Sequence, residues 1–460
     1  MNLFKYGFHA PQNKTTRAIK NYATLVLALG SANAVAGIGG AGTNFGLGPI
    51  SVGTAMAYSS QLSNPMSVYY NPASLARSDM TEIMLFSHYG DTELRARSLG
   101  GAAPVQREGN VLSDNSSEML VIGMTTPIMK NGLKNPSAVF GINLGVDEYT
   151  KNFLPFNAST SEVGQFVRYE SEPLYIGLAV AVPDVISGID FGIGTRLTLD
   201  ATASLNASSD LGGNTDSEEL GMKASPNFSM NMGVNVDFDK LFCGSTRCEK
   251  LDAYQAAIFW RDESYWNVAV NANLVVPGVI PEPGLNVMLN TIDSFQPEVF
   301  GGSLKIQTTE NLQAILSIEK QIWSSLTGAF KKDSVRDQAN LKFQDTLVPR
   351  LGVRYQIYKN FFAYSGISYE ESPLRGRQSV DVNYFDSDKM TYGLGLEHQS
   401  INALGTNTNV IVGAGIQYQQ LEEREFELIN INSPTYPDPY ETIVADGEAI
   451  VVSASLSIIF

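Results

Sequence analysis

The sequence of 460 residues lacks any long run of apolar residues. No stretch reaches the about 18 consecutive apolar residues that a membrane-spanning helix needs, so insertion into a bilayer would have to use strands. Histidine and cysteine are scarce, with three and two copies, and neither H-E-x-x-H nor G-x-S-x-G occurs. Since nothing pairs a nucleophile with a base, we predict that the protein is not an enzyme.

Basic residues are also few, with 31 Lys and Arg against 47 Asp and Glu, and the formal net charge is −16 at pH 7. Phosphate backbones are bound by clustered basic side chains, so this balance argues against a nucleic-acid partner. The run from Gly37 to Gly42 matches G-x-G-x-x-G, but no strand precedes it and dinucleotide binding is not expected. We expect no cofactor and no metal.

The alternating segment 450–460, IVVSASLSIIF, is the most informative part of what is present. Apolar residues occupy the even positions, and Ser453, Ser455 and Ser457 lie on the opposite face. An apolar face opposite a small polar face, ending on the aromatic Phe460, is typical of the closing strand of an outer-membrane barrel. The alternative is a buried final strand of an ordinary β domain.

The first 36 residues have the composition of a secretory signal peptide. Basic residues precede an apolar run at 22–29, and Ala34-Val35-Ala36 follows as a cleavage pattern. We expect cleavage after Ala36, with Ala34 as the alternative. The long basic region leaves a mitochondrial-type presequence or an uncleaved anchor open.

Alternating runs separated by turn signals recur along the rest of the chain, and Gly (41) and Tyr (20) are abundant. They predict an all-β protein, a transmembrane antiparallel β-barrel of about 14 strands, an even number as single-chain bacterial barrels have. The candidate strands lie at 81–89, 119–128, 138–149, 166–182, 190–205, 220–237, 253–274, 295–307, 312–323, 341–358, 361–369, 390–398, 409–421 and 448–460.

The connections between these strands alternate in length, as expected if outer loops are long and periplasmic turns are short. A soluble sandwich has no reason to sort its loops in this way. The connection at 238–252 is long for its class and holds the only cysteines, Cys243 and Cys248. In an exported protein this pair is expected to form a disulfide across a turn, with metal binding as the minor alternative.

The strand patterns also predict which side chains face the lumen. In the strands that begin at 190 and 347 the odd set is apolar and should face lipid, which turns Arg196, Arg350 and Arg354 inward. The same parity places Glu319, Glu397 and Gln417 inside, with a row of glycines (393, 395, 413, 415) that leaves room in the channel. The alternative is that these charges only pair with one another.

Several motifs, in order, resemble those of the FadL-like outer-membrane transporters (the FadL/TodX family). Val52-Gly53-Thr54-Ala55-Met56-Ala57 and then Asn71-Pro72-Ala73 resemble the N-terminal hatch of that family. Further matches follow downstream, with Trp260-Arg261-Asp262-Glu263, Gln296-Pro297-Glu298, Ile322-Trp323-Ser324, Pro349-Arg350-Leu351-Gly352-Val353 and Gly366 to Pro373. The chain departs from the family at 61–65, where acidic residues are often found.

The resemblance implies three regions: a signal peptide at 1–36, a hatch or plug at 37–80 that carries Asn71, Pro72 and Ala73, and a transmembrane barrel at 81–460. It implies uptake of long-chain fatty acids or related hydrophobic compounds, such as alkanes or aromatic hydrocarbons, across the outer membrane of a Gram-negative bacterium. The N-terminus would face the periplasm, and the partners would be the hydrophobic ligand, outer-membrane lipid and lipopolysaccharide, with the protein a monomer.

Two sets of residues are the candidate ligand sites. The apolar loop at 274–288 is a candidate capture site through Val279, Ile280, Leu285 and Val287, with a loop packed against its neighbours as the alternative. Luminal Arg196, Arg261, Arg350 and Arg354 could receive a carboxylate through charge-assisted hydrogen bonds. If the ligand is an alkane, those charges are structural.

Two other functions are compatible with a barrel. A general diffusion porin would have an open lumen, and the residues at 37–80 ahead of the first strand argue against it. A structural or adhesive outer-membrane barrel would bind partners with aromatic loop residues, such as Tyr436 and Tyr440.

Overall fold

The computed structural model describes most of the chain from residue 41 onward. The described ranges are 41–101, 115–129, 136–156, 165–171, 174–199, 205–209, 215–219, 222–224, 227–244, 248, 251–276, 280–331, 341–376, 378–379, 386–402, 408–428 and 441–460. The expected signal peptide at 1–36, Val279, Tyr436 and Tyr440 lie outside these ranges.

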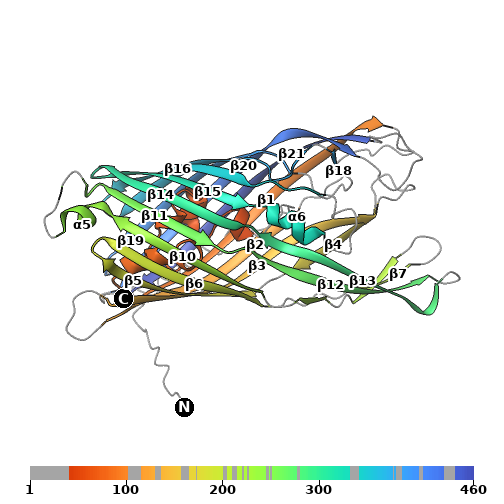
Figure 1. The fold of residues 1–460 in the computed structure, drawn as a ribbon, viewed down its shortest axis with the longest axis horizontal. Helices are drawn as coiled ribbons and strands as arrows, with labels where there is room; N and C mark the ends of the chain where they lie inside the picture. Colours follow the sequence, from red (N-terminus) through yellow and green to blue (C-terminus); the bar gives the residue numbers. More distant parts are fainter. Residues whose placement is uncertain are drawn as a thin grey trace, which may run out of the picture.

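Fourteen antiparallel strands form a closed barrel (Figure 1), which confirms the predicted fold class and strand number. Each pairs with the next along the barrel wall, and the first strand pairs with the last to close the ring. The wall strands are β1 (Glu82–Gly101), β2 (Asn115–Ile128), β3 (Ala138–Phe156), β5 (Leu174–Ile186), β6 (Ile189–Leu199), β10 (Asn227–Asp237), β11 (Tyr254–Arg261), β14 (Glu298–Thr309), β15 (Leu312–Ile322), β16 (Thr346–Tyr358), β17 (Phe361–Glu370), β19 (Lys389–Ser400), β20 (Asn409–Leu428) and β21 (Glu441–Ile459).

The terminal strand is placed as predicted. Its residues pair with β1 from Glu82↔Ile459 to Gly101↔Glu441, and with β20 on the other side. Ser453, Ser455 and Ser457 are buried, whereas Ile450 and Ile458 are exposed on the outer face. Strand β16 shows the same division, with Leu347, Leu351 and Tyr355 outside and Arg350 inside. An outer face covered with large apolar side chains suits a hydrocarbon environment.

The predicted strands differ from the observed ones in detail at the long-loop end. The segment 166–182 corresponds to β4 (Gln165–Ser171) and β5, and β3 pairs with both in one register. The segment 220–237 corresponds to β9 (Met222–Ala224) and β10. The segment 253–274 is divided at Asp262 and Glu263, where β11 ends and β12 (Ser264–Val276) begins. Strand β9 pairs with β12 in the same register as β10 with β11, so the ladder resumes beyond the charged pair.

Outside the wall, β12 pairs with β13 (Ile280–Gln296), β9 and β7 (Leu205–Ser209), which pairs with β8 (Thr215–Glu219). The predicted apolar loop at 274–288 is therefore mostly strand. The backbones of β12 and β13 pair across a hairpin, so this apolar segment has a structural partner. The short β18 (Gln378–Ser379) pairs with β20.

The connections are sorted by length between the two ends, as predicted. The end that carries Thr81 and Phe460, here called the short-turn end, has connections at 129–137, 187–188, 238–253, 310–311, 359–360 and 401–408. The opposite, long-loop end has the others, including α6 (Ser324–Phe330). The exception at 238–253 contains α5 (Phe238–Cys243). Within the described ranges, no helix is both long and apolar enough to cross a membrane.

The N-terminal segment 41–80 folds into short helices that pack against the inner face of the wall. They are α2 (Ala41–Asn44), α3 (Pro49–Gly53), η1 (Ser59–Gln61), α4 (Ser67–Tyr70) and η2 (Pro72–Arg77). Helix α3 contacts β19, β20 and β21, whereas η2 contacts β5, β6 and β10. The segment thus joins opposite parts of the ring.

Inward-facing glycines make this packing possible. A Cβ added at Gly393 would lie 2.7 Å from the carbonyl carbon of Gly53, and one added at Gly53 would lie 2.8 Å from the Cα of Gly395. A Cβ at Gly366 would overlap the backbone of Thr54, and one at Gly415 the backbone of Pro49. The glycine row predicted to leave an open channel therefore leaves space that the N-terminal backbone occupies.

The Asn-Pro-Ala triplet has a precise set of contacts. The Asn71 side chain accepts a hydrogen bond from Ala73 N and donates to Ser60 O and, at 2.8 Å, to Asn235 Oδ1 of β10. Pro72 begins η2, where a missing N–H costs no hydrogen bond. Gly192 and Gly233 have no side chain in the way of this turn. The triplet thereby fixes η2 to the wall.

We predict that Gly366→Ala displaces the N-terminal segment, because overpacking of this kind costs about 1–3 kcal/mol. The measurement is protease cleavage within residues 41–80 of the folded barrel in detergent, which should be faster in the variant. Gly302→Ala is the matched control, since its Cβ would have no neighbour closer than 3.6 Å. Equal cleavage of both variants would contradict the role assigned to Gly366.

Candidate functional site

Three of the four arginines singled out in the sequence converge inside the barrel. Arg196 of β6, Arg261 of β11 and Arg350 of β16 line one cavity together with Glu319 of β15. Glu319 is buried, and its carboxylate lies 3.0 Å from Arg350 Nη1 and 3.4 Å from Arg261 Nη2. One carboxylate therefore holds two guanidinium groups.

Arg196 is held differently, by neutral groups. Its Nη1 donates to Gln296 Oε1 at 3.0 Å, and its guanidinium carbon lies 4.2 Å from the centre of the Tyr175 ring. Tyr69 of α4 lies between Arg196 and Arg261, at 5.5 and 5.1 Å from ring centre to guanidinium carbon. Aromatic faces stabilise the cations here. Arg196 is thus the member of the cluster that forms no ion pair with Glu319.

Several N–H donors of the arginine cluster are not used in hydrogen bonds with the described residues. Arg196 Nε, Arg261 Nη1 and Arg350 Nε are buried and have no hydrogen-bond partner among the described residues. The cavity is lined by these three arginines and by Glu319 and Asp262, an excess of one formal positive charge. Buried donors without partners are costly, so the site is suited to an oxygen acceptor.

The cavity is small, with a volume of about 40 Å³. That space holds water molecules but not a long alkyl chain. Val68, Met56, Met230 and Val299 form its apolar lining. Five lining residues belong to the N-terminal segment: Thr43, Met56, Val68, Tyr69 and Tyr70. Room for a larger molecule would therefore come from movement of that segment or of its side chains.

Arg354 lies elsewhere, contrary to the grouping expected from the sequence. It lines a second cavity, of about 350 Å³, toward the short-turn end. Its Nε donates to Tyr364 OH at 3.1 Å and its guanidinium stacks on Phe362. Glu397 also lines this cavity, with Arg77, Lys305 and Glu82. The surroundings are polar, which makes this cavity a poor environment for a hydrocarbon.

Tyr70 fixes the N-terminal segment beside the arginine cluster. Its hydroxyl accepts a hydrogen bond from Leu47 N, and burial raises the pKa of Tyr70 to about 12. The phenol is therefore neutral at physiological pH and supplies no negative charge to Arg261, whose guanidinium lies 5.7 Å from the ring centre. Tyr69, Tyr70 and Tyr175 were not singled out from the sequence, although Tyr69 and Tyr70 directly precede the Asn-Pro-Ala triplet.

The residues of the expected capture site lie at the long-loop end. Ile280, Leu285 and Val287 are on β13, where Leu285 pairs with Leu274 and Val287 with Ala272 of β12. Val279 lies outside the described residues. The prediction that they belong to a loop is wrong for these three, because the apolar residues continue the β12–β13 ladder.

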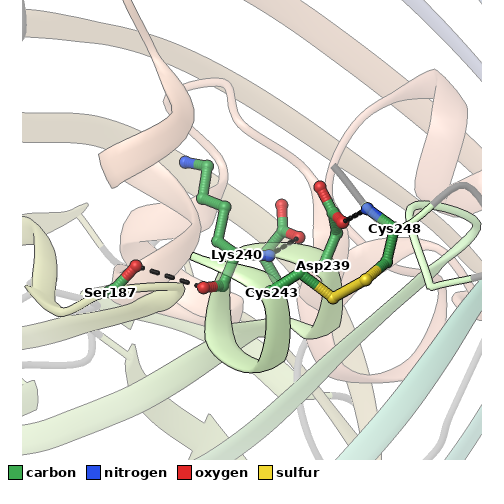
Figure 2. The surroundings of a disulfide bond; sticks show 6 residues. Ser187, Asp239, Lys240, Cys243 and Cys248 are labelled. Carbon is green, nitrogen blue, oxygen red and sulfur yellow. Dashed lines mark hydrogen bonds between the residues drawn. A yellow bond between two sulfur atoms is a disulfide. The ribbon is translucent and has the colours of Figure 1, made fainter. Parts of the chain in front are cut away.

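The two cysteines form a disulfide at the short-turn end (Figure 2). Cys243 ends α5, and the backbone N–H of Cys248 donates to the Asp239 carboxylate. Asp239, Cys243 and Cys248 are close together, but sulfur atoms joined in a disulfide are not thiolate ligands.

We predict that Glu319→Gln destabilises the barrel by about 3–5 kcal/mol, because it leaves two buried guanidinium groups without their anion. The measurement is urea unfolding of the folded protein in detergent. Glu423→Gln is the control, since its pair with Arg97 is exposed and is worth at most about 1 kcal/mol. Equal destabilisation by the two variants would contradict the pairing seen here.

Comparison with known proteins places the chain in a family. Residues 45–460 match the family described as outer membrane protein transport protein (OMPP1/FadL/TodX). Alkane uptake protein A of Marinobacter nauticus is 34% identical over 452 residues, 97% of each chain. In fold, the chain resembles a Pseudomonas aeruginosa FadL homologue (TM-score 0.59, 12% identity, 93% of this chain and 99% of that one). It also resembles the P. putida toluene transporter TodX (TM-score 0.52, 13% identity, 90% and 99%). The chain belongs to the FadL/TodX family of outer-membrane transport proteins.

Proposed function

We propose that this protein takes up long-chain alkanes across the outer membrane. The observation that carries the proposal is the 34% identity to alkane uptake protein A over 97% of both chains. An alkane enters the hydrated saccharide layer of lipopolysaccharide only at a high free-energy cost. Passage through a protein that binds the alkane along the way is therefore faster.

The N-terminal segment is proposed to be the plug of this transporter, with residues 37–80 as the plug and 81–460 as the barrel. Its backbone occupies the space beside Gly366, Gly393 and Gly415, which argues against a general diffusion porin. We assign the signal peptide to 1–36, the short-turn end to the periplasm and the long-loop end to the cell exterior. The transporter acts as a monomer surrounded by phospholipid and lipopolysaccharide.

The entry and exit of the ligand are part of the proposal. Val279, Ile280, Leu285 and Val287 at the long-loop end form the capture surface. A lateral exit through β3 would require a gap in its ladders with β2 and β5, which run unbroken over 139–146, so we propose an exit through the lumen instead. Gly141 and Gly145 instead make room for Val68, Leu75 and Tyr175. Release therefore follows a rearrangement of the plug.

A second ligand class, long-chain carboxylates, is favoured by one observation. The arginine cluster has buried donors without partners and an excess of positive charge. Arg196 is the residue assigned to the carboxylate, because it has no ion pair with Glu319 and its Nε is free to donate. Arg350, another of the four candidates from the sequence, is already held by Glu319 at 3.0 Å.

Uptake by cells tests the alkane proposal. A strain that lacks this gene should take up a labelled long-chain alkane more slowly than the same strain complemented with the intact chain. Lipids that co-purify with the folded protein should include the hydrocarbon when cells are grown on it, as identified by mass spectrometry. Unchanged alkane uptake on deletion, with no bound hydrocarbon, would refute the proposal.

Substitution of Arg196 separates the two ligand classes. Arg196→Met should weaken fatty-acid binding about tenfold or more and spare alkane binding, because one charge-assisted hydrogen bond is lost. The measurement is equilibrium binding of a fatty acid and an alkane of the same chain length. Arg354→Met is the control, since Arg354 lines the other cavity. Equal losses for both ligands would exclude a carboxylate role for Arg196.

A further inference from the structure

An exposed group of apolar side chains projects at the short-turn end. It consists of Val185 and Ile186, the last two residues of β5, and Phe242 in α5, and is here called the apolar knob. These side chains are 57%, 62% and 68% exposed. The ring of Phe238 stacks on that of Phe242, with centroids 6.2 Å apart. A cluster of exposed large apolar side chains typically marks a surface that contacts a partner or a membrane.

Several contacts hold the apolar knob in a fixed conformation. Ser187 Oγ donates to Lys240 O at 3.1 Å and joins the turn to α5 (Figure 2). Lys240 Nζ lies 3.7 Å from the carboxylate of Asp184. Gly188 packs directly on the backbone of Leu241. A six-residue helix is not stable alone, and the Cys243–Cys248 disulfide closes the chain just behind it.

The apolar knob continues the outer face of the barrel wall. Ile186 is in register with Ile189, and Ile189 is in register with Val236, so these three side chains share one face of the sheet. That face is the outer one, because Phe191 and Ile193 follow Ile189 on it and are both exposed. Through Ile186, the knob therefore continues a row of side chains that faces hydrocarbon.

Aromatic residues mark the membrane boundary at the same end. Tyr254, Tyr358 and Phe460 are exposed at the short-turn ends of β11, β16 and β21. Aromatic side chains gather at the level of the lipid headgroups in barrels of this kind. The charged groups of Asp184 and Lys240 lie beside the apolar knob, as expected of a segment at an interface between water and lipid.

We propose that the apolar knob inserts into the interfacial region of the phospholipid leaflet at the short-turn end, and that the disulfide holds α5 in the shape this requires. The ligand is a lipid surface rather than a protein, because the knob continues the lipid-facing rows through register-paired residues. The inference is independent of the substrate that the transporter carries.

Site-specific photocrosslinking tests the inference in cells. The photoreactive residue p-benzoylphenylalanine is placed at position 242, and adducts formed on irradiation are identified by mass spectrometry of the purified barrel. Phospholipid adducts are expected at 242. The same probe at Ile258, which is 64% exposed in the wall, is the positive control. The probe at Glu310, in the polar β14–β15 turn at the same end, should give no lipid adduct.

Two outcomes would overturn the proposal. One is a protein adduct of defined mass at 242 in place of lipid, and the other is the absence of lipid adducts at 242 when Ile258 gives them. The role of the disulfide is tested with Cys243→Ser and Cys248→Ser together, which should cause loss of lipid adducts at 242 and leave those at 258 unchanged. Retention of the adducts at 242 in that variant would refute the role of the disulfide.

Discussion

Hydrogen bonding between β1 and β21 closes the ring on which every other feature depends. In hydrocarbon, a backbone N–H or C=O without a partner costs several kcal/mol, so a sheet with two free edges cannot span a bilayer. Residues from Glu82 to Gly101 pair with residues from Ile459 to Glu441, and this leaves no open edge in the membrane-spanning part of the wall. The remaining strands can then expose apolar side chains outward and polar ones inward.

Closure creates an interior, and the N-terminal segment packs against its wall at the level of backbone contact. Glycines in β17, β19 and β20 accept α3, whereas Gly192 and Gly233 accept the turn that begins at Asn71. The arginine cluster lies where this packing leaves a small space. Its buried N–H donors lie next to Tyr69 and Val68 of the segment. A ligand bound by these donors would therefore also contact the segment and affect its position.

The barrel wall could be predicted from the sequence, because the alternation of apolar and polar residues, the loop lengths and the face on which each side chain lies are all local properties. Each strand constrains the strand that pairs with it. The inward direction of Arg196, Arg350 and Arg354 followed from parity alone. Parity does not give height in the barrel, and Arg354 lies four residues beyond Arg350 on β16, nearer the short-turn end and beside Tyr364 and Phe362. Strand β13 was missed because a strand beyond the end of the wall has the same apolar composition as a loop packed on its neighbours. The glycines were recognised, but their contacts depend on a segment distant in sequence.

The broad contact between the N-terminal segment and the wall has a consequence for the order of assembly. Helix α3 lies against β19, β20 and β21, and η2 lies against β5, β6 and β10, so the segment touches strands from both halves of the ring. Passage of this folded segment through a closed ring would break many of those contacts at once. Closure of the seam between β1 and β21 therefore encloses the segment between strands from both halves of the ring, so that the segment and the closed ring have to be assembled together.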